Sequence, residues 1–165
     1  MDSKILILDK ERIQRKLRRM AYEIWERHCK ETTLHFVAVE GTGTHVAHQL
    51  ANHLTEISPL KIHFHSLPID KRNPLAHTSQ FSENLNDKPV VLIDDVANSG
   101  KTLLYAMKPL LTFMPKSIII AVLVDRKHKS FPVSPDIVGH TVATTLQDHI
   151  EVVCDGDEIK GAYLQ

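Results

Sequence analysis

Two adjacent carboxylates and a hydroxyl-bearing turn stand together in the run VVLIDDVANSGKT, residues 90–102. Its first four residues are all apolar, which is typical of a strand buried on both faces of a parallel sheet. Asp94 and Asp95 follow at the carboxyl end of this strand, where open α/β sheets bind their ligands, and we expect both side chains to be exposed there. Ser99 and Gly100 then form a turn before a helix start, whose free N–H groups and dipole favour a phosphate. Acids beside a phosphate cradle indicate a ligand with hydroxyls as well as phosphate, such as a sugar phosphate.

The same turn ends like a nucleotide-binding P-loop, with Gly100, Lys101 and Thr102 in sequence. A P-loop requires glycine five positions before Gly100, and the residue there is Asp95, whose carboxylate would repel phosphates. A P-loop hydrolase is therefore the weakest interpretation. The two acids could also do no more than cap the turn. Two adjacent acids directly before a phosphate-type turn favour the binding role.

A second glycine turn lies earlier in the chain and consists of Glu40, Gly41, Thr42 and Gly43. A dinucleotide-binding fingerprint would need a third glycine at position 46, which is Val46. The turn is then either a plain strand–helix connection or a second anion cradle made of backbone N–H groups. Two cradles beside a pair of acids would suit a ligand with phosphates at both ends.

The elements that must position these turns alternate between strands and helices. Strands are expected at residues 5–8, 34–39, 60–67, 90–93, 117–125, 137–142 and 150–154, and helices at 10–30, 45–57 and 102–114. This alternation predicts a single-domain α/β fold over residues 1–165, with a doubly wound, mostly parallel sheet and helices on both faces. Residues 70–88 are polar and aperiodic and predict a functional loop or hairpin. The acidic residues from 155 onward are expected to lead into a C-terminal tail.

The composition excludes several classes of protein. The 20 basic and 20 acidic side chains cancel, so no overall positive charge draws the chain to nucleic acid. No apolar run is long enough for a membrane span, and the first residues lack a signal-peptide pattern. Cys29 and Cys154 lie far apart, which favours reduced thiols and a cytoplasmic location.

Histidines and arginines offer two further candidate sites. His45 with His48, and His63 with His65, could each hold a metal, but neither pair has a carboxylate at ligand spacing. We therefore expect solvated or core histidines. The expected helix at residues 10–30 is strongly basic, and its face is either a solvated surface or a contact surface for a polyanion or an acidic partner. The cations concerned are Arg12, Arg15, Lys16, Arg18, Arg19 and Arg27.

Residues 90–102 resemble the signature of type I phosphoribosyltransferases: a hydrophobic strand, two acids and a turn of small residues. Residues 7–27 and 121–140 are in addition similar to the bacterial pyrimidine-operon attenuation regulators, which double as uracil phosphoribosyltransferases. The resemblance covers most of the chain and is weakest over residues 70–88. It implies a type I phosphoribosyltransferase-like fold, with a small hood region for the base and a homodimer or higher homo-oligomer.

The resemblance also implies a reaction, in which phosphoribosyl pyrophosphate donates its 5-phosphoribosyl group to a nucleobase, with uracil the first choice. Asp94 and Asp95 would be the catalytic acids that accept hydrogen bonds from the ribose hydroxyls. The ribose phosphate would lie against Ala97, Asn98, Ser99, Gly100, Lys101 and Thr102, the pyrophosphate against Glu40, Gly41, Thr42 and Gly43, and the base against Asp125, Arg126 and Ile150. Mg²⁺ would bind through the substrate, with Asp94 and Asp95 as candidate direct ligands.

The chain departs from the regulators in ways that favour an alternative function. Glu40 and Thr42 replace a lysine and an arginine, which should weaken pyrophosphate binding, and the 70–88 segment is shorter than the regulators' lid. Lys71, Arg72 and His77 are candidates to compensate. Tyr22, Ser134 and His140 replace histidine or basic residues of the RNA surface, so RNA is a possible partner but not the favoured one. The alternative is therefore a weakly active or inactive sensor of a nucleotide or of phosphoribosyl pyrophosphate, regulating pyrimidine genes through RNA or a protein partner.

Overall fold

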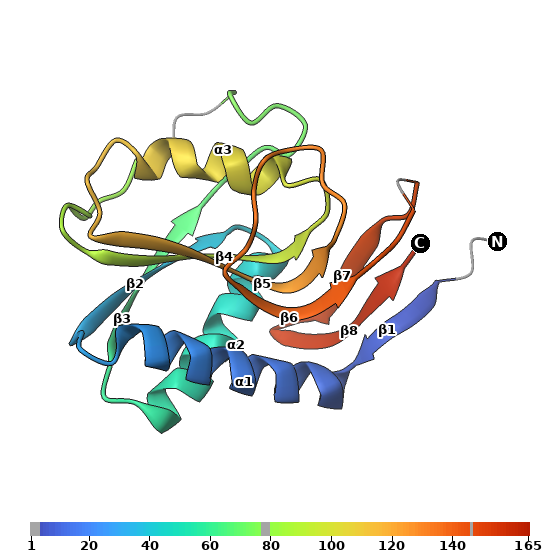
Figure 1. The fold of residues 1–165 in the computed structure, drawn as a ribbon, viewed down its shortest axis with the longest axis horizontal. Helices are drawn as coiled ribbons and strands as arrows, with labels where there is room; N and C mark the ends of the chain where they lie inside the picture. Colours follow the sequence, from blue (N-terminus) through green and yellow to red (C-terminus); the bar gives the residue numbers. More distant parts are fainter. Residues whose placement is uncertain (1–3, 77–79, 146) are drawn as a thin grey trace.

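The computed structural model describes residues 4–76, 80–145 and 147–165, and its central layer is a five-stranded sheet (Figure 1). The strands are β2 (Thr33–Val39), β3 (Lys61–Leu67), β4 (Pro89–Ala97), β5 (Ser117–Arg126) and β6 (Ile137–Val142). Their order is β3-β2-β4-β5-β6, and every neighbouring pair is parallel. The three middle strands are almost fully buried, as their uninterrupted apolar runs require. The predicted doubly wound α/β fold is confirmed.

Helices cover both faces of this sheet. Helices α1 (Lys10–His28) and α2 (Thr42–Ile57) pack against one face, and α3 (Lys101–Leu110) packs against the other (Figure 1). The side chain of Asp9 caps α1 by accepting a hydrogen bond from the Arg12 N–H at 2.8 Å. The buried stripe of α1 follows the helical repeat, with Ile13, Leu17, Met20 and Ile24 all fully buried.

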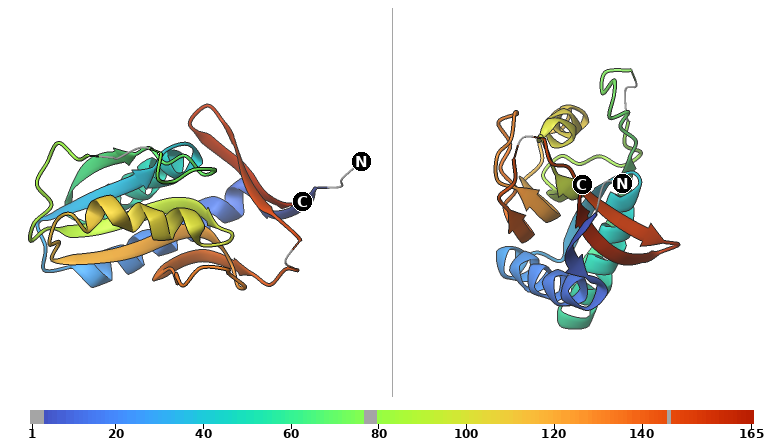
Figure 2. Two further views of the ribbon diagram at one scale, coloured as in Figure 1. Left: turned by 90° about the horizontal axis from the view of Figure 1, so that it is seen from above. Right: turned by 90° about the vertical axis from the view of Figure 1, so that its right-hand side faces the viewer.

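A second, antiparallel sheet forms the predicted hood at the carboxyl edge of the parallel sheet (Figure 2). It contains β1 (Ile5–Asp9), β8 (Glu158–Leu164) and β7 (Ile150–Asp155), in the order β1-β8-β7. The expectation of a C-terminal tail is therefore wrong. The acidic residues 155–158 form a hairpin turn in which Gly156 has φ +58°, and the chain beyond them returns as a strand that buries Ile159 and Ala162.

Four helix ends differ from the expected ones, by one to four residues, and the start of α2 affects the site. Helix α2 begins at Thr42, so Gly43 already belongs to its first turn. Helix α3 ends at Leu110, next to Pro109, which removes a backbone donor near the helix end. In the described part of the chain, no helix is both long and apolar enough to cross a membrane.

Candidate functional site

The two predicted acids lie at the carboxyl end of β4, close to the turn that leads into α3. Their expected exposure is wrong, because Asp94 is 2% and Asp95 9% exposed. Oδ1 of Asp94 accepts a hydrogen bond from the Asp95 N–H at 2.8 Å, and Oδ1 of Asp95 accepts one from the Val96 N–H at 2.8 Å. The backbone thus fixes the orientation of both carboxylates before a ligand arrives.

Two acids this close and this deeply buried perturb each other. Burial, followed by the neighbouring charge of Asp95, raises the pKa of the Asp94 carboxyl well above its usual range, and the charge of Lys71 and the hydrogen bond from the Asp95 N–H act in the opposite direction. Burial and Asp95 also raise the pKa of the Cys154 thiol on β7. The site therefore carries negative charge with little compensation, and hydroxyl donors or a cation would relieve it.

The predicted phosphate turn is fixed by hydrogen bonds to Ser99 from residues 130 and 131 and from the start of α3. The Ser99 carbonyl accepts hydrogen bonds from the N–H groups of Ser130 and Phe131, both at 3.1 Å, and its side-chain oxygen accepts one from the Lys101 N–H at 3.2 Å. Gly100 has φ +83°, a left-handed conformation that favours glycine. The first N–H groups of α3 are therefore presented by a turn that is already formed.

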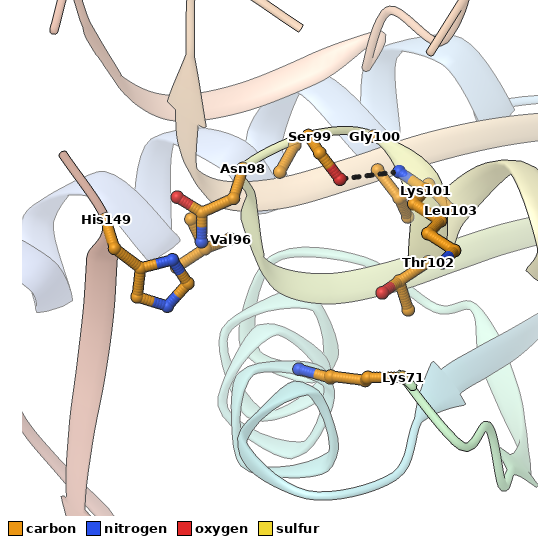
Figure 3. Close-up of a pocket in the computed structure, with 10 residues that line it drawn as sticks. Lys71, Val96, Asn98, Ser99, Gly100, Lys101, Thr102, Leu103 and His149 are labelled. Carbon is orange, nitrogen blue, oxygen red and sulfur yellow. Dashed lines mark hydrogen bonds between the residues drawn. The ribbon is translucent and has the colours of Figure 1, made fainter. Parts of the chain in front are cut away.

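A cavity of about 200 Å³ opens in front of this turn (Figure 3). Its lining consists of Lys71, Val96, Ala97, Asn98, Ser99, Gly100, Lys101, Thr102, Leu103 and His149. Lys71 lies across the cavity from the turn, on the segment after β3, and supplies a cation where a phosphate would bind (Figure 3). His149 was missed, since nothing in its local sequence distinguishes it. Arg72 does not line the cavity, and His77 lies outside the described residues.

The second predicted cradle approaches the acids directly. A Cβ atom added to Gly43 would lie 3.0 Å from Oδ1 and 3.3 Å from Cα of Asp94, so only glycine allows the start of α2 to pack this closely on the end of β4. Gly41, the N-cap of the helix, has φ +101°. The Glu40 carboxylate accepts a hydrogen bond from the Ser66 hydroxyl at 2.9 Å, which holds it toward β3. Two helix N-termini thus flank the acid pair.

The residues predicted for the base pocket lie together, at the seam between the parallel sheet and the hood. The Asn98 side chain donates to the Ile150 carbonyl at 3.0 Å and accepts from the Ile150 N–H at 3.1 Å. Arg126 is buried, and its guanidinium donates to the carbonyls of Asn98 and Asp148 at 3.2 and 2.7 Å. These bonds are structural and fix the hood in place, a role that sequence reasoning did not assign to Asn98 or Arg126. Asp125 pairs with Lys129 at 2.7 Å.

This arrangement defines a class of protein: an α/β protein whose parallel sheet presents two buried acids between two glycine-containing helix starts, beneath a small hood. Residues 6–155 match the family model described as the phosphoribosyl transferase domain. The chain belongs to the phosphoribosyltransferase family, as the resemblance of residues 90–102 indicated.

Curated relatives at about 30% identity agree with this assignment. The chain is 33% identical over 161 residues to the bifunctional protein PyrR of Limosilactobacillus fermentum, covering 90% of each chain. It is 30% identical over 178 residues to the bifunctional protein PyrR of Listeria welshimeri, covering 99% of this chain and 97% of that one.

Solved structures support the fold. A hypoxanthine-guanine phosphoribosyltransferase from Bacillus anthracis superposes with a TM-score of 0.75 at 17% identity, over 87% of this chain and 85% of that chain. The hypoxanthine phosphoribosyltransferase of Trypanosoma cruzi gives a TM-score of 0.73 at 17% identity, over 83% and 81%. At this identity the likeness concerns the fold.

Proposed function

We propose that the protein transfers the 5-phosphoribosyl group from phosphoribosyl pyrophosphate to a nucleobase, uracil being the first choice. One observation carries the proposal: the buried pair Asp94 and Asp95 lies between two glycine-containing helix starts, at residues 41–43 and 99–102. Such a site matches a ligand with a diol in the middle and phosphates at both ends. The choice of uracil rests on the similarity of residues 7–27 and 121–140 to the pyrimidine-operon regulators.

Each part of the site has a role in this reaction. Asp94 and Asp95 would accept hydrogen bonds from the ribose hydroxyls, and the 97–102 turn, with Lys71 opposite, would hold the 5-phosphate. The bond from the anomeric carbon to the pyrophosphate oxygen breaks, and pyrophosphate leaves with that electron pair. A base nitrogen supplies the pair for the new bond and loses its proton. The protein contributes mainly by positioning and by stabilising charge.

Mg²⁺ is the cofactor we propose for this site. Asp94 and Asp95 provide carboxylate oxygens, the ligands that Mg²⁺ prefers. The raised pKa of Asp94, caused by burial and by Asp95, is the effect expected of an acid pair that lacks a counter-ion. When bound with the substrate, the ion would draw charge from the leaving pyrophosphate.

The decisive test separates transfer from binding alone. The protein is incubated with Mg²⁺, phosphoribosyl pyrophosphate and each base of a panel, while nucleotide and pyrophosphate are measured. We expect uridine monophosphate with uracil, and a loss of product in Asp95→Asn. Calorimetry of donor binding runs in parallel. Donor binding without product from any base would refute the transferase proposal and favour the sensor. The presence of Glu40 and Thr42, where the regulators have a lysine and an arginine, would then account for the lack of transfer.

A second candidate function rests on the basic face of α1. Arg12, Arg15, Lys16 and Arg19 line one surface hollow of about 340 Å³. We propose this basic hollow as a site for RNA, whose phosphates it would neutralise. A labelled RNA stem-loop should lose affinity when Arg15→Glu and Lys16→Glu are combined. Arg18→Glu is the control, because Arg18 is on the same helix but outside the hollow, and an equal loss there would refute a localised site.

The assembly and location also remain proposals. We propose that residues 1–165 act as one domain, since β1 and β8, from the two ends of the chain, pair in the hood sheet. We propose a homodimer or higher homo-oligomer, supported by exposed apolar side chains at Ile5, Leu6, Leu111 and Met114, with light scattering as the test. The free thiols of Cys29 and Cys154 are consistent with a cytoplasmic protein.

A further inference from the structure

We propose a second metal site, separate from the acids, in which His35, His65 and Glu83 bind a divalent transition metal ion, Zn²⁺ being the first choice. His35 lies on β2 and His65 on the edge strand β3, and both are buried. Glu83 comes from the segment between β3 and β4, where the neighbouring Phe81 and Leu85 pack into the core on the α3 side of the sheet. Their ligand atoms all lie within 4.8 Å of one another.

This cluster is distinct from the proposed substrate site. His35 pairs in register with Val90 on β4, and Asp94 lies four residues further along that strand. At the rise of a parallel strand, four residues correspond to about 13 Å. The cluster therefore lies toward the opposite end of the sheet from the acid pair and the phosphate turn.

Parallel strand pairing creates the cluster. The register places His63 beside His35 and His65 beside Val37, so the three imidazoles share one face of the sheet. The ring of His35 stacks on those of His63 and His65, with centroids 4.9 and 5.2 Å apart. The Phe81 ring packs edge-on against His65, with centroids 5.8 Å apart, and this contact brings the following residues, including Glu83, over the histidines.

The distances are close to those of a tetrahedral zinc site. Nδ1 of His35 and Nε2 of His65 are 2.9 Å apart, and Nδ1 of His35 is 3.9 Å from Oε2 of Glu83. Zn²⁺ bonds of about 2.0–2.1 Å in tetrahedral geometry place ligand atoms roughly 3.3 Å apart. The nitrogens must separate and the carboxylate approach, each by about half an ångström. The Glu83 side chain is 49% exposed, which leaves it room to move.

A further imidazole, that of His63, lies beside Glu83. Nδ1 of His63 is 3.8 Å from Oε2 of Glu83, and the His63 side chain is 42% exposed. Either this imidazole or a water molecule would complete the tetrahedron. The pair His63 and His65 has no carboxylate at ligand spacing in the sequence. The fold brings one to His65 from a distance, because Glu83 lies 18 residues further along the printed sequence.

The ligand set selects the kind of metal. Two imidazoles and one carboxylate suit Zn²⁺ and its neighbours, whereas Mg²⁺ prefers oxygen ligands alone. Metal binding requires neutral imidazoles, and the rings of both His35 and His65 are buried. On binding, the hydrogen shared between the two rings moves to the outer nitrogen of its own ring. Both inner lone pairs then face the ion.

A bound ion would fasten the segment between β3 and β4 to the edge of the sheet. This segment also carries Lys71, which lines the cavity of the proposed substrate site. The metal would therefore be structural. Its expected effects are a higher melting temperature and greater protection of the segment from proteolysis.

The test uses metal-free full-length protein and no substrate, so its outcome is independent of the transferase proposal. Calorimetric titration with Zn²⁺ should give one ion per chain, and Co²⁺ should give the intense visible absorption of a tetrahedral site. We expect Glu83→Gln to weaken Zn²⁺ binding at least tenfold and His65→Gln more. Glu83 is half exposed, so its variant tests the site even if His65→Gln fails to fold.

The matched control is His53→Ala, which removes a half-buried imidazole that bonds to Gln14 on the other side of the sheet. Its Zn²⁺ affinity should equal that of the wild type. The proposal is overturned if Zn²⁺ does not bind one to one, if Glu83→Gln binds as well as the wild type, or if His53→Ala loses as much affinity.

Discussion

The close contact between Gly43 and Asp94 gives the sharpest test of the site geometry. In Gly43→Ala, the new Cβ would lie 3.0 Å from Oδ1 and 3.3 Å from Cα of Asp94, and 3.4 Å from the Ile93 carbonyl oxygen. Two of these three atoms belong to the backbone and cannot rotate away. The end of β4 and the start of α2 must therefore separate by a few tenths of an ångström.

The expected cost follows from this overlap. Overpacking of this kind costs about 1–3 kcal/mol. Replacing a helical glycine by alanine stabilises the helix by about 0.5–1 kcal/mol. We therefore expect the free energy of unfolding of Gly43→Ala to fall by about 1 kcal/mol, and at most by about 2.5 kcal/mol. Donor affinity should fall about tenfold, because a displaced Asp94 loses most of one charge-assisted hydrogen bond worth about 1.5–3 kcal/mol.

Urea denaturation measures the first quantity, and calorimetric titration with phosphoribosyl pyrophosphate and Mg²⁺ measures the second. The control is Asn52→Ala on the exposed face of the same helix, which should keep donor affinity and gain slight stability. Wild-type stability together with wild-type donor affinity in Gly43→Ala would refute the idea that α2 and the acid pair form one tightly packed unit.

Three further predictions address neighbouring parts of the molecule. Asp94→Asn should be more stable than the wild type at neutral pH. Burial raises the folded-state pKa of Asp94 above 3.8, so the stability of the wild type falls as pH rises through that folded pKa. Urea titrations should show the difference in stability at neutral pH and its disappearance near pH 3. Glu40→Gln should tighten donor binding about three- to tenfold, because it removes the repulsion between the Glu40 carboxylate and the charges of the pyrophosphate. Each such pair of charges costs about 0.5 kcal/mol at roughly 8 Å in water, and the pyrophosphate carries several charges. Calorimetry measures the affinity, and Glu56→Gln is the control that should leave it unchanged. Asn98→Ala should lose both bonds to Ile150 and about 1–3 kcal/mol of unfolding free energy, and hydrogen exchange should rise in the hood while α1 keeps its protection. Unchanged exchange in the hood would contradict that role.

The sequence by itself determined the features that depend on neighbouring residues. The apolar run of β4, its acid pair and the turn at Ser99 and Gly100 are all local, and they indicated the family, while the alternation of strand and helix patterns along the chain predicted the fold. The helical repeat of α1 and its cap at Asp9 are local for the same reason. Element bounds were less well determined: β4 runs on through both acids to Ala97, and α3 ends at Leu110, four residues before its expected end.

Only the tertiary structure decided which distant residues meet. Parallel pairing of β2 and β3, with the segment after β3 folded over them, places Glu83 beside His35 and His65. Pairing of β8 with β1 turned an expected tail into part of the hood. The acids that looked exposed at a strand end are buried, because α2 packs against them through Gly43. Burial and long-range pairing arise from the packing of whole elements, which local sequence patterns do not encode.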